Sequence, residues 1–145
     1  MNRLRRSLLA ALGALVLKPL AALAAWNEQA FGAKTAADAL KTLGAGAAAP
    51  SQDIVIDAPQ IAENGAVVPI EIASNIPGTT SIVVLIEKNP FPLTGRFDFK
   101  EGALPFVKLN VKMGETSEVR VLAEAGGKHY SASREIKVTI GGCGG

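Results

Sequence analysis

Apolar and polar residues alternate with a period of two along most of the chain after residue 53, a pattern typical of β-strands. Phe97 and Phe99, for example, alternate with charged neighbours. Seven segments of strand length show this alternation or a continuous apolar run: residues 53–57, 66–74, 81–88, 95–100, 106–113, 117–125 and 129–140. They predict an all-β fold, an immunoglobulin-like antiparallel β-sandwich of about seven strands over residues 54–140.

The segment at residues 81–86 (SIVVLI) is apolar at every position after its serine. A strand that is apolar on both sides is buried on both faces. We therefore expect it either at the centre of a sheet or at a contact with a partner subunit.

Two dipeptides, Asn64-Gly65 and Gly126-Gly127, are typical of tight turns because their residues tolerate positive φ. They predict sharp connections between neighbouring strands. Pro69 cannot donate a backbone hydrogen bond, so its strand is predicted to be an edge strand or to carry a bulge.

Before the strands, apolar residues between Trp26 and Leu43 recur near the spacing of a helix. They predict one short amphipathic helix that ends at Gly44. A connector rich in Gly, Ala and Pro follows, so residues 25–53 are interpreted as an N-terminal helix and linker.

Residues 1–24 have the features of an export signal. Arg3, Arg5 and Arg6 precede a short apolar run at residues 8–17, and residues 22–24 (ALA) match a signal-peptidase site. The run is too short for a membrane span, which takes about 20 apolar residues. We expect cleavage after Ala24 and a periplasmic protein; the paired arginines favour a twin-arginine signal, with general secretion as the alternative.

Loss of the signal changes the charge of the chain. The full sequence has 15 Lys+Arg, 13 Asp+Glu and a formal net charge of +2. Four basic residues and no acidic ones leave with the signal, so the mature chain has 11 basic and 13 acidic residues and a net charge of −2. The mature composition therefore gives no indication of a nucleic-acid partner.

A conventional enzyme site is difficult to assemble from the remaining residues. His129 is the only histidine, which excludes a His-rich metal site, and it is predicted to lie solvated beside a turn. The sequence shows no phosphate-binding glycine loop and no nucleophile elbow. Asp98 and Glu101 fit the outside of a strand and its turn better than an acid/base pair. We expect no catalytic residue, no metal and no cofactor.

Cys143 is the only cysteine, and it lies between Gly141, Gly142, Gly144 and Gly145. The last alternating apolar residue is Ile140, so residues 141–145 are predicted to leave the sandwich as a flexible arm. Three residues beyond Ile140 carry the thiol about 10 Å outward. Glycines lack Cβ, so the arm is thin and turns freely, which suits a carrier that presents a covalent cargo to several enzymes.

A different function is also compatible with one exported thiol. A cysteine on a mobile tail can pair with the same residue of a second copy. The alternative is therefore an exported immunoglobulin-like interaction module whose cysteine only forms an intermolecular disulfide.

Three segments together resemble the SoxY family, the sulfur carriers of the thiosulfate-oxidising Sox system. They are the terminal GGCGG after KVTI, residues 61–65 (IAENG) before Val68-Pro69-Ile70, and residues 88–92 (KNPFP) before the paired phenylalanines. The resemblance runs from about residue 54 to the C-terminus.

The resemblance implies an immunoglobulin-like fold and a carrier rather than an enzyme. It implies that Cys143 is the covalent sulfur attachment site and that the four glycines form the arm. It also implies a SoxZ-like partner subunit, for whose contact residues 81–86 are a candidate. The expected pathway enzymes are a c-type haem protein that couples thiosulfate to the thiol, a hydrolase that releases sulfate and a sulfur dehydrogenase.

Overall fold

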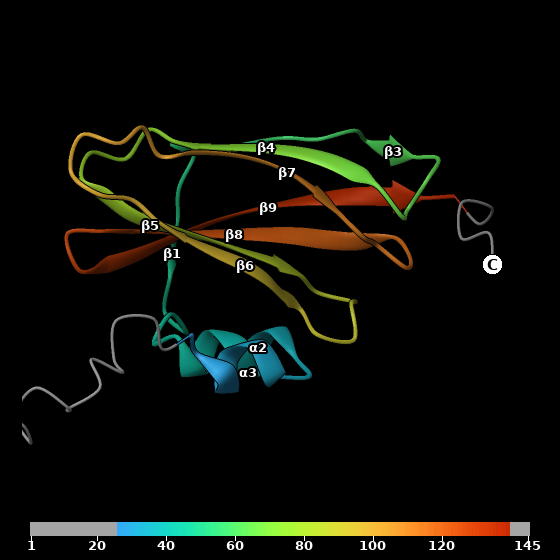
Figure 1. The fold of residues 1–145 in the computed structure, drawn as a ribbon, viewed down its shortest axis with the longest axis horizontal. Coiled ribbons are helices and arrows are strands. Elements are labelled where there is room, and N and C mark those ends of the chain that lie inside the picture. Colours follow the sequence, from blue (N-terminus) through green and yellow to red (C-terminus); the bar gives the residue numbers. More distant parts are fainter. Residues whose placement is uncertain (1–25, 140–145) are drawn as a thin grey trace, which may run out of the picture.

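The computed structural model describes residues 26–139, which form three layers (Figure 1). Two short helices cover one face of a six-stranded sheet, and a three-stranded sheet covers the other. The seven main strands are β2 (Ile54–Asp57), β4 (Val68–Ser74), β5 (Thr79–Ile86), β6 (Leu93–Asp98), β7 (Phe106–Val111), β8 (Ser117–Ala125) and β9 (Lys128–Val138). The predicted all-β sandwich of about seven strands is therefore confirmed.

Two strands of two residues each, β1 (Ala49–Pro50) and β3 (Ile61–Ala62), add to the predicted set. The large sheet has the order β1-β9-β8-β5-β6, with β3 also paired to β9, and the small sheet has the order β2-β4-β7. The main strands pair antiparallel, whereas β1 and β3 both run parallel to β9. The N-terminal linker thus contributes one strand to the sandwich.

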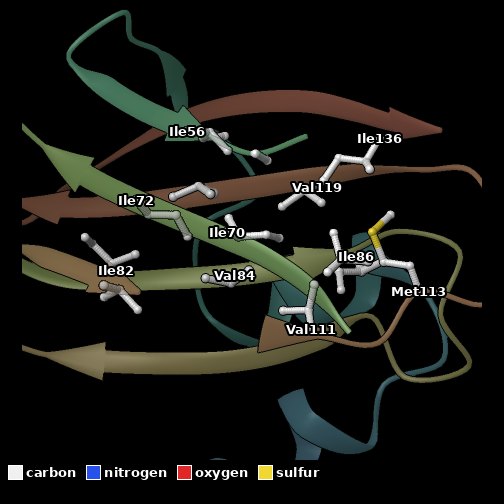
Figure 2. Packing of buried hydrophobic residues seen from close by; sticks show 14 of the residues in the cluster. Ile56, Ile70, Ile72, Ile82, Val84, Ile86, Val111, Met113, Val119 and Ile136 are labelled. Atoms are coloured by element: carbon white, nitrogen blue, oxygen red, sulfur yellow. The ribbon is translucent and has the colours of Figure 1, made fainter. Parts of the chain in front are cut away.

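The core lies between the two sheets, where side chains of alternate residues meet (Figure 2). The small sheet contributes Ile70 and Ile72, and the large sheet contributes Ile82, Val84 and Ile86 from β5. Each of these side chains is at most 1% exposed. Burial of one such side chain contributes roughly 1.5–3 kcal/mol, so apolar packing stabilises the sandwich.

Strand β5 is buried on both faces, as its continuous apolar sequence predicts. Val83 and Leu85 point away from the sandwich core and pack under the helices with Leu40, Leu93 and Leu122. The expectation of a central strand is confirmed. The candidate partner contact at residues 81–86 is wrong, because this chain itself covers both faces of the strand.

The single helix predicted between residues 26 and 43 is wrong in its continuity. The structure has two helices, α2 (Glu28–Gly32) and α3 (Ala36–Thr42). Thr35 between them is extended, and its Oγ1 accepts a hydrogen bond from the Asp38 amide at 3.1 Å. A threonine in this position begins a new helix because it satisfies an unpaired first-turn N–H. The side chain of Asn27 caps α2 in the same way.

Predictions at turns and prolines have mixed outcomes. Gly126 and Gly127 have φ of 57° and 73° and join β8 to β9, as predicted. β4, which contains Pro69, is the middle strand of the small sheet, so the edge prediction is wrong for the strand as a whole. However, β4 pairs with β2 only from Glu71 onward, so β4 has a free side at Pro69.

Candidate functional site

The predicted arm and the predicted signal both lie outside the described residues. Cys143 and its four flanking glycines follow Thr139, the last described residue, and residues 1–24 precede the first. The structure therefore bears on the site through the end of β9, from which the arm continues. We call Val138 and Thr139 the arm base.

The arm base is held by hydrogen bonds on both sides of β9. On one side, the Thr139 amide donates to the Ala62 carbonyl of β3 at 3.2 Å, and the Lys137 amide donates to the Gln60 carbonyl at 3.0 Å. On the other side, the Val138 amide donates to Oγ1 of Thr116 at 3.0 Å. Each bond contributes about 0.5–1.5 kcal/mol net, so β9 stays ordered up to its last residue.

Gly65 packs directly against the arm base. A Cβ added to it would lie 2.3 Å from the Met113 carbonyl oxygen and 2.8 Å from Cγ1 of Val138. The Met113 amide donates to the Gly65 carbonyl at 2.7 Å, which fixes this close approach. The predicted positive φ at Gly65 is wrong, because positive φ occurs only at other glycines among the described residues. A glycine occupies this position because there is no space for a side chain.

The supporting role of residues 60–65 escaped the sequence-based prediction. β3 has only two residues, too few to show a period of two, and its partner β9 is more than 70 residues away in the sequence. The Asn-Gly pair was visible, but it indicated a turn rather than a close backbone contact. The same segment nevertheless contributes to the family resemblance, and the structure gives it a physical function.

An open cleft lies at the same end of the sandwich as the arm base. Its volume is about 590 Å³, and it is lined by Lys88, Asn89, Pro90, Lys112, Gly114 and Glu115. Its two walls are the loop between β5 and β6 and the loop between β7 and β8. The Asn89 side-chain amide donates to the Lys112 carbonyl at 2.8 Å, which links the two walls. We call this feature the lysine cleft.

Only a few of the basic side chains between residues 26 and 139 form ion pairs. Arg96, Lys108 and Arg120 each lie within ion-pair distance of at least one carboxylate. The exposed Lys108 donates a hydrogen bond to Glu71, which raises the pKa of the lysine above its ordinary value of 10.5. Lys88 and Lys112, like most basic residues in this range, form no ion pair with any residue from 26 to 139.

His129 lies at the start of β9, and the arm base lies at its end. Nine residues separate it from Val138, which at about 3.3 Å per residue is roughly 30 Å. Four residues lead from Thr139 to Cys143, a reach of only about 14 Å. A Cys–His dyad within one chain is therefore excluded. His129 is partly buried, with Nε2 3.9 Å from Oε2 of Glu124.

The described residues also bear on metal and membrane sites. Between residues 26 and 139 there is no group of three or more His, Cys, Asp or Glu side chains placed to hold a metal ion. In the same part of the chain, no helix is long and apolar enough to cross a membrane.

Comparisons with known proteins agree with the fold. A family model described as "Sulfur oxidation protein SoxY" matches residues 39–143. The solved structure of the sulfur carrier protein SoxY from Chlorobium limicola f thiosulfatophilum is 41% identical, with a TM-score of 0.63 over 71% of this chain and 96% of that one. A comparison with curated protein sequences finds no match.

A second solved structure is similar in fold alone. It is the superoxide reductase (neelaredoxin) from Ignicoccus hospitalis, 19% identical, with a TM-score of 0.53 over 59% of this chain and 79% of that chain. At this identity the likeness carries no information about chemistry.

Proposed function

The chain belongs to the SoxY family of sulfur oxidation proteins, and on that premise we propose that it carries sulfur intermediates covalently on the thiol of Cys143. The match to the family model extends through residue 143, so it includes the cysteine. The similar Chlorobium structure is that of a sulfur carrier protein. Both findings support a carrier in the Sox system rather than an enzyme.

The single observation that carries the site assignment is the two-sided anchoring of the arm base. Because the Val138 amide donates a hydrogen bond to Thr116 and the Thr139 amide donates one to β3, residues 140–145 start from a fixed point. Four residues place the thiol up to about 14 Å from Thr139. A fixed base and a short glycine arm define a small volume in which partner enzymes can meet the thiol. This arrangement suits a cargo that several enzymes must reach in turn.

The chemistry begins with the loading of the thiol. The sulfur of Cys143 forms a bond to the outer sulfur of thiosulfate, a proton leaves, and two electrons pass to the c-type haem protein of the pathway. The product is an anionic S-thiosulfonate. Water then cleaves the bond to the sulfonate group, which releases sulfate and two protons and leaves a persulfide anion on Cys143. A sulfur dehydrogenase then takes six electrons from the outer persulfide sulfur, while three water molecules supply oxygen and release six protons, which gives an S-sulfonate. A second hydrolysis by one more water releases sulfate and a proton and frees the thiol.

The partner and the compartment belong to the same proposal. The carrier works with a SoxZ-like subunit in the periplasm, which it reaches through a signal that is cleaved after Ala24. The domain division is a signal at residues 1–24, a helix and linker at 25–53, the sandwich at 54–140 and the arm at 141–145. The twin-arginine features of the signal support export of a folded complex with the partner.

The test combines one substitution with one mass measurement. Cys143→Ser should abolish thiosulfate-dependent turnover in the reconstituted pathway, whereas binding of the partner subunit should be unchanged. The intact mass of protein from thiosulfate-fed cells should show additions of sulfur or sulfur oxoanions on the Cys143 peptide, and reductant should remove them. Full turnover by the serine variant would refute the proposal. A doubled mass alone would favour the disulfide-linked interaction module.

A further inference from the structure

We propose that Asn64, in the turn after β3, is a site of spontaneous deamidation, and that its conversion to isoaspartate loosens the arm base. The reaction needs no enzyme, cofactor or oxidant and consumes only water. Asn64 is exposed, and the next residue, Gly65, has no side chain to shield the backbone nitrogen between them. The inference concerns the sandwich alone, so it does not depend on what Cys143 carries.

The reaction joins the backbone nitrogen of Gly65 to the side chain of Asn64. This nitrogen loses its proton and attacks Cγ of Asn64, while Nδ2 takes up a proton and leaves as ammonia. A cyclic imide remains. Water then opens the imide at either of its carbonyl carbons. One product is aspartate with the original backbone, and the other is isoaspartate, in which the backbone passes through Cβ and Cγ.

Two backbone amides of the turn are placed where this reaction develops negative charge. The Ala66 amide donates to Oδ1 of Asn64 at 3.0 Å, and this oxygen gains charge when Cγ is attacked. The Val67 amide donates to the backbone carbonyl of Asn64 at 3.3 Å, and this oxygen shares the charge of the deprotonated Gly65 amide. Both hydrogen bonds strengthen as the charge develops, so they stabilise the transition state more than the ground state.

The attacking nitrogen is unoccupied and is held near its target. Within the described part of the chain, the Gly65 amide donates no hydrogen bond, so none has to break before it loses its proton. The hydrogen bond from Ala66 to Oδ1 closes a ring that contains both Cγ of Asn64 and the Gly65 nitrogen. The ring keeps these two atoms on the same side of the turn, which lowers the entropic cost of bringing them together.

The isoaspartate product does not fit the packing of Gly65. Its backbone has one extra atom between residues 64 and 65, so Gly65 must shift. A Cβ on Gly65 would lie 2.3 Å from the Met113 carbonyl oxygen, so there is no room on that side. A shift in the other direction breaks the hydrogen bond from the Met113 amide to the Gly65 carbonyl, which is 2.7 Å long. The aspartate product keeps the original backbone and only adds a negative charge.

The displacement reaches the arm base through β3, which lies beside the end of β9 (Figure 1). Ala62 precedes Asn64 by two residues, and its carbonyl accepts the hydrogen bond from the Thr139 amide. Val138 borders Gly65 itself, with Cγ1 2.8 Å from the Cβ position. Movement of the turn therefore disturbs both residues of the arm base. The pairing of β9 with β8 ends at Ile136 and is left intact.

The experiment ages the mature chain in mildly alkaline buffer and follows residue 64 by mass spectrometry. A glutamyl endopeptidase, used at acidic pH, cuts after Glu63 and Glu71 and releases residues 64–71. We expect the mass of this peptide to rise by the difference between water and ammonia. An isoaspartyl methyltransferase acting on the whole protein should label the aged chain and not the fresh one. Asn64→Gln should abolish both signals, because its longer side chain does not form the same ring.

An internal control comes from Asn75, which is also exposed. The next residue, Ile76, has a branched side chain, and its amide donates to Oγ of Ser74 at 3.4 Å. Asn75 should therefore remain unchanged while Asn64 converts.

Two comparisons test the contribution of the turn. Conversion of Asn64 should be about two- to tenfold faster in the folded chain than in the same chain unfolded in urea, because the urea-unfolded chain lacks both turn hydrogen bonds. Ala66→Pro removes the donor to Oδ1 and should slow conversion in the folded chain by a similar factor. The comparison with urea needs no variant, so it stands even if the proline disturbs the fold.

Hydrogen exchange measured by NMR tests the effect on the arm base. The aged chain contains both products, whereas the variant Asn64→Asp contains aspartate alone. The Thr139 amide should exchange about tenfold faster in the isoaspartate form, as expected for loss of one hydrogen bond, and at its ordinary rate in Asn64→Asp. The Val121 amide, in the middle of β8, should exchange at the same rate in all samples.

The outcomes that contradict the inference are distinct. Slower conversion in the folded chain than in urea would show that the turn protects Asn64. Equal exchange of the Thr139 amide in the isoaspartate form and in fresh protein would remove the link to the arm base. None of these measurements involves the pathway or its cargo, so the proposed function is judged separately, from turnover by the Cys143→Ser variant.

Discussion

Substitution of Gly65 by alanine tests the packing that holds the arm base. The added methyl group would lie 2.3 Å from the Met113 carbonyl oxygen, which belongs to the backbone and cannot rotate away. It would also lie 2.8 Å from Cγ1 of Val138. The loop at residue 65 must therefore move away from β9, and the hydrogen bond from the Met113 amide to the Gly65 carbonyl lengthens or breaks.

The magnitude follows from two contributions. Overpacking in a tight site costs about 1–3 kcal/mol, and loss of one hydrogen bond costs about 1 kcal/mol. The sum is a destabilisation of about 2–4 kcal/mol. For a domain of this size, each kcal/mol lowers Tm by about 4 °C, so Tm should fall by about 8–16 °C.

Urea unfolding of the mature chain, followed by circular dichroism, measures this change, and a scanning calorimeter gives Tm. Gly114→Ala is the matched control, because a Cβ there meets nothing within 4 Å and the residue lies next to Met113. The control should be neutral or stabilised by up to about 1 kcal/mol, through lower entropy of the unfolded chain. Equal urea midpoints for the two variants would refute the close-packing argument.

Three further substitutions test other parts of the structure. Leu85→Ala should destabilise the chain by about 3 kcal/mol, because the fully buried side chain of Leu85 packs β5 against the helices. A decrease of the urea midpoint by less than about 1 M would contradict this. Thr116→Val keeps the side-chain shape but removes the acceptor for the Val138 amide. Hydrogen exchange at that amide should therefore accelerate about tenfold. An unchanged exchange rate would show that Thr116 does not hold the arm base. Glu71→Gln should lower the pKa of Lys108 towards 10.5, which NMR of the lysine side chain can follow. In the native protein, the stabilisation from this pair should persist below pH 10.5 and disappear as pH rises above it.

The strands could be predicted because their side chains alternate between core and solvent. Phe97 and Phe99 pack against the core, while Asp98 between them is exposed, as their positions in the sequence require. The apolar run at residues 81–86 breaks this alternation, and it correctly indicated a strand that is buried on both faces. What covers the second face could not be read from this run, since the helices contribute mostly small residues such as Ala30 and Ala39.

Features that depend on contacts between distant segments were not predictable. The break between α2 and α3 depends on which polar residue caps a helix, and Thr35 lies within an otherwise continuous helical pattern. The packing of Gly65 against Met113 brings together residues about 50 positions apart. The lysine cleft likewise combines two loops, and neither loop has a distinctive charge pattern of its own.

Strand β3 has two effects: it covers part of the open edge of β9, and it holds the residues from which the arm continues. β9 lies next to β8 on one side, and its other side would be a long open edge without the two short parallel strands. β1 pairs with it at residues 130–131 and β3 at residues 137–138, so both ends of the edge are covered. Open edges promote association with other chains. The pairing with β3 that limits such association also fixes the residues from which the arm departs. The last core residue, Ile136, lies before this point and is fully buried, so cargo chemistry beyond residue 139 need not disturb the packing of the sandwich.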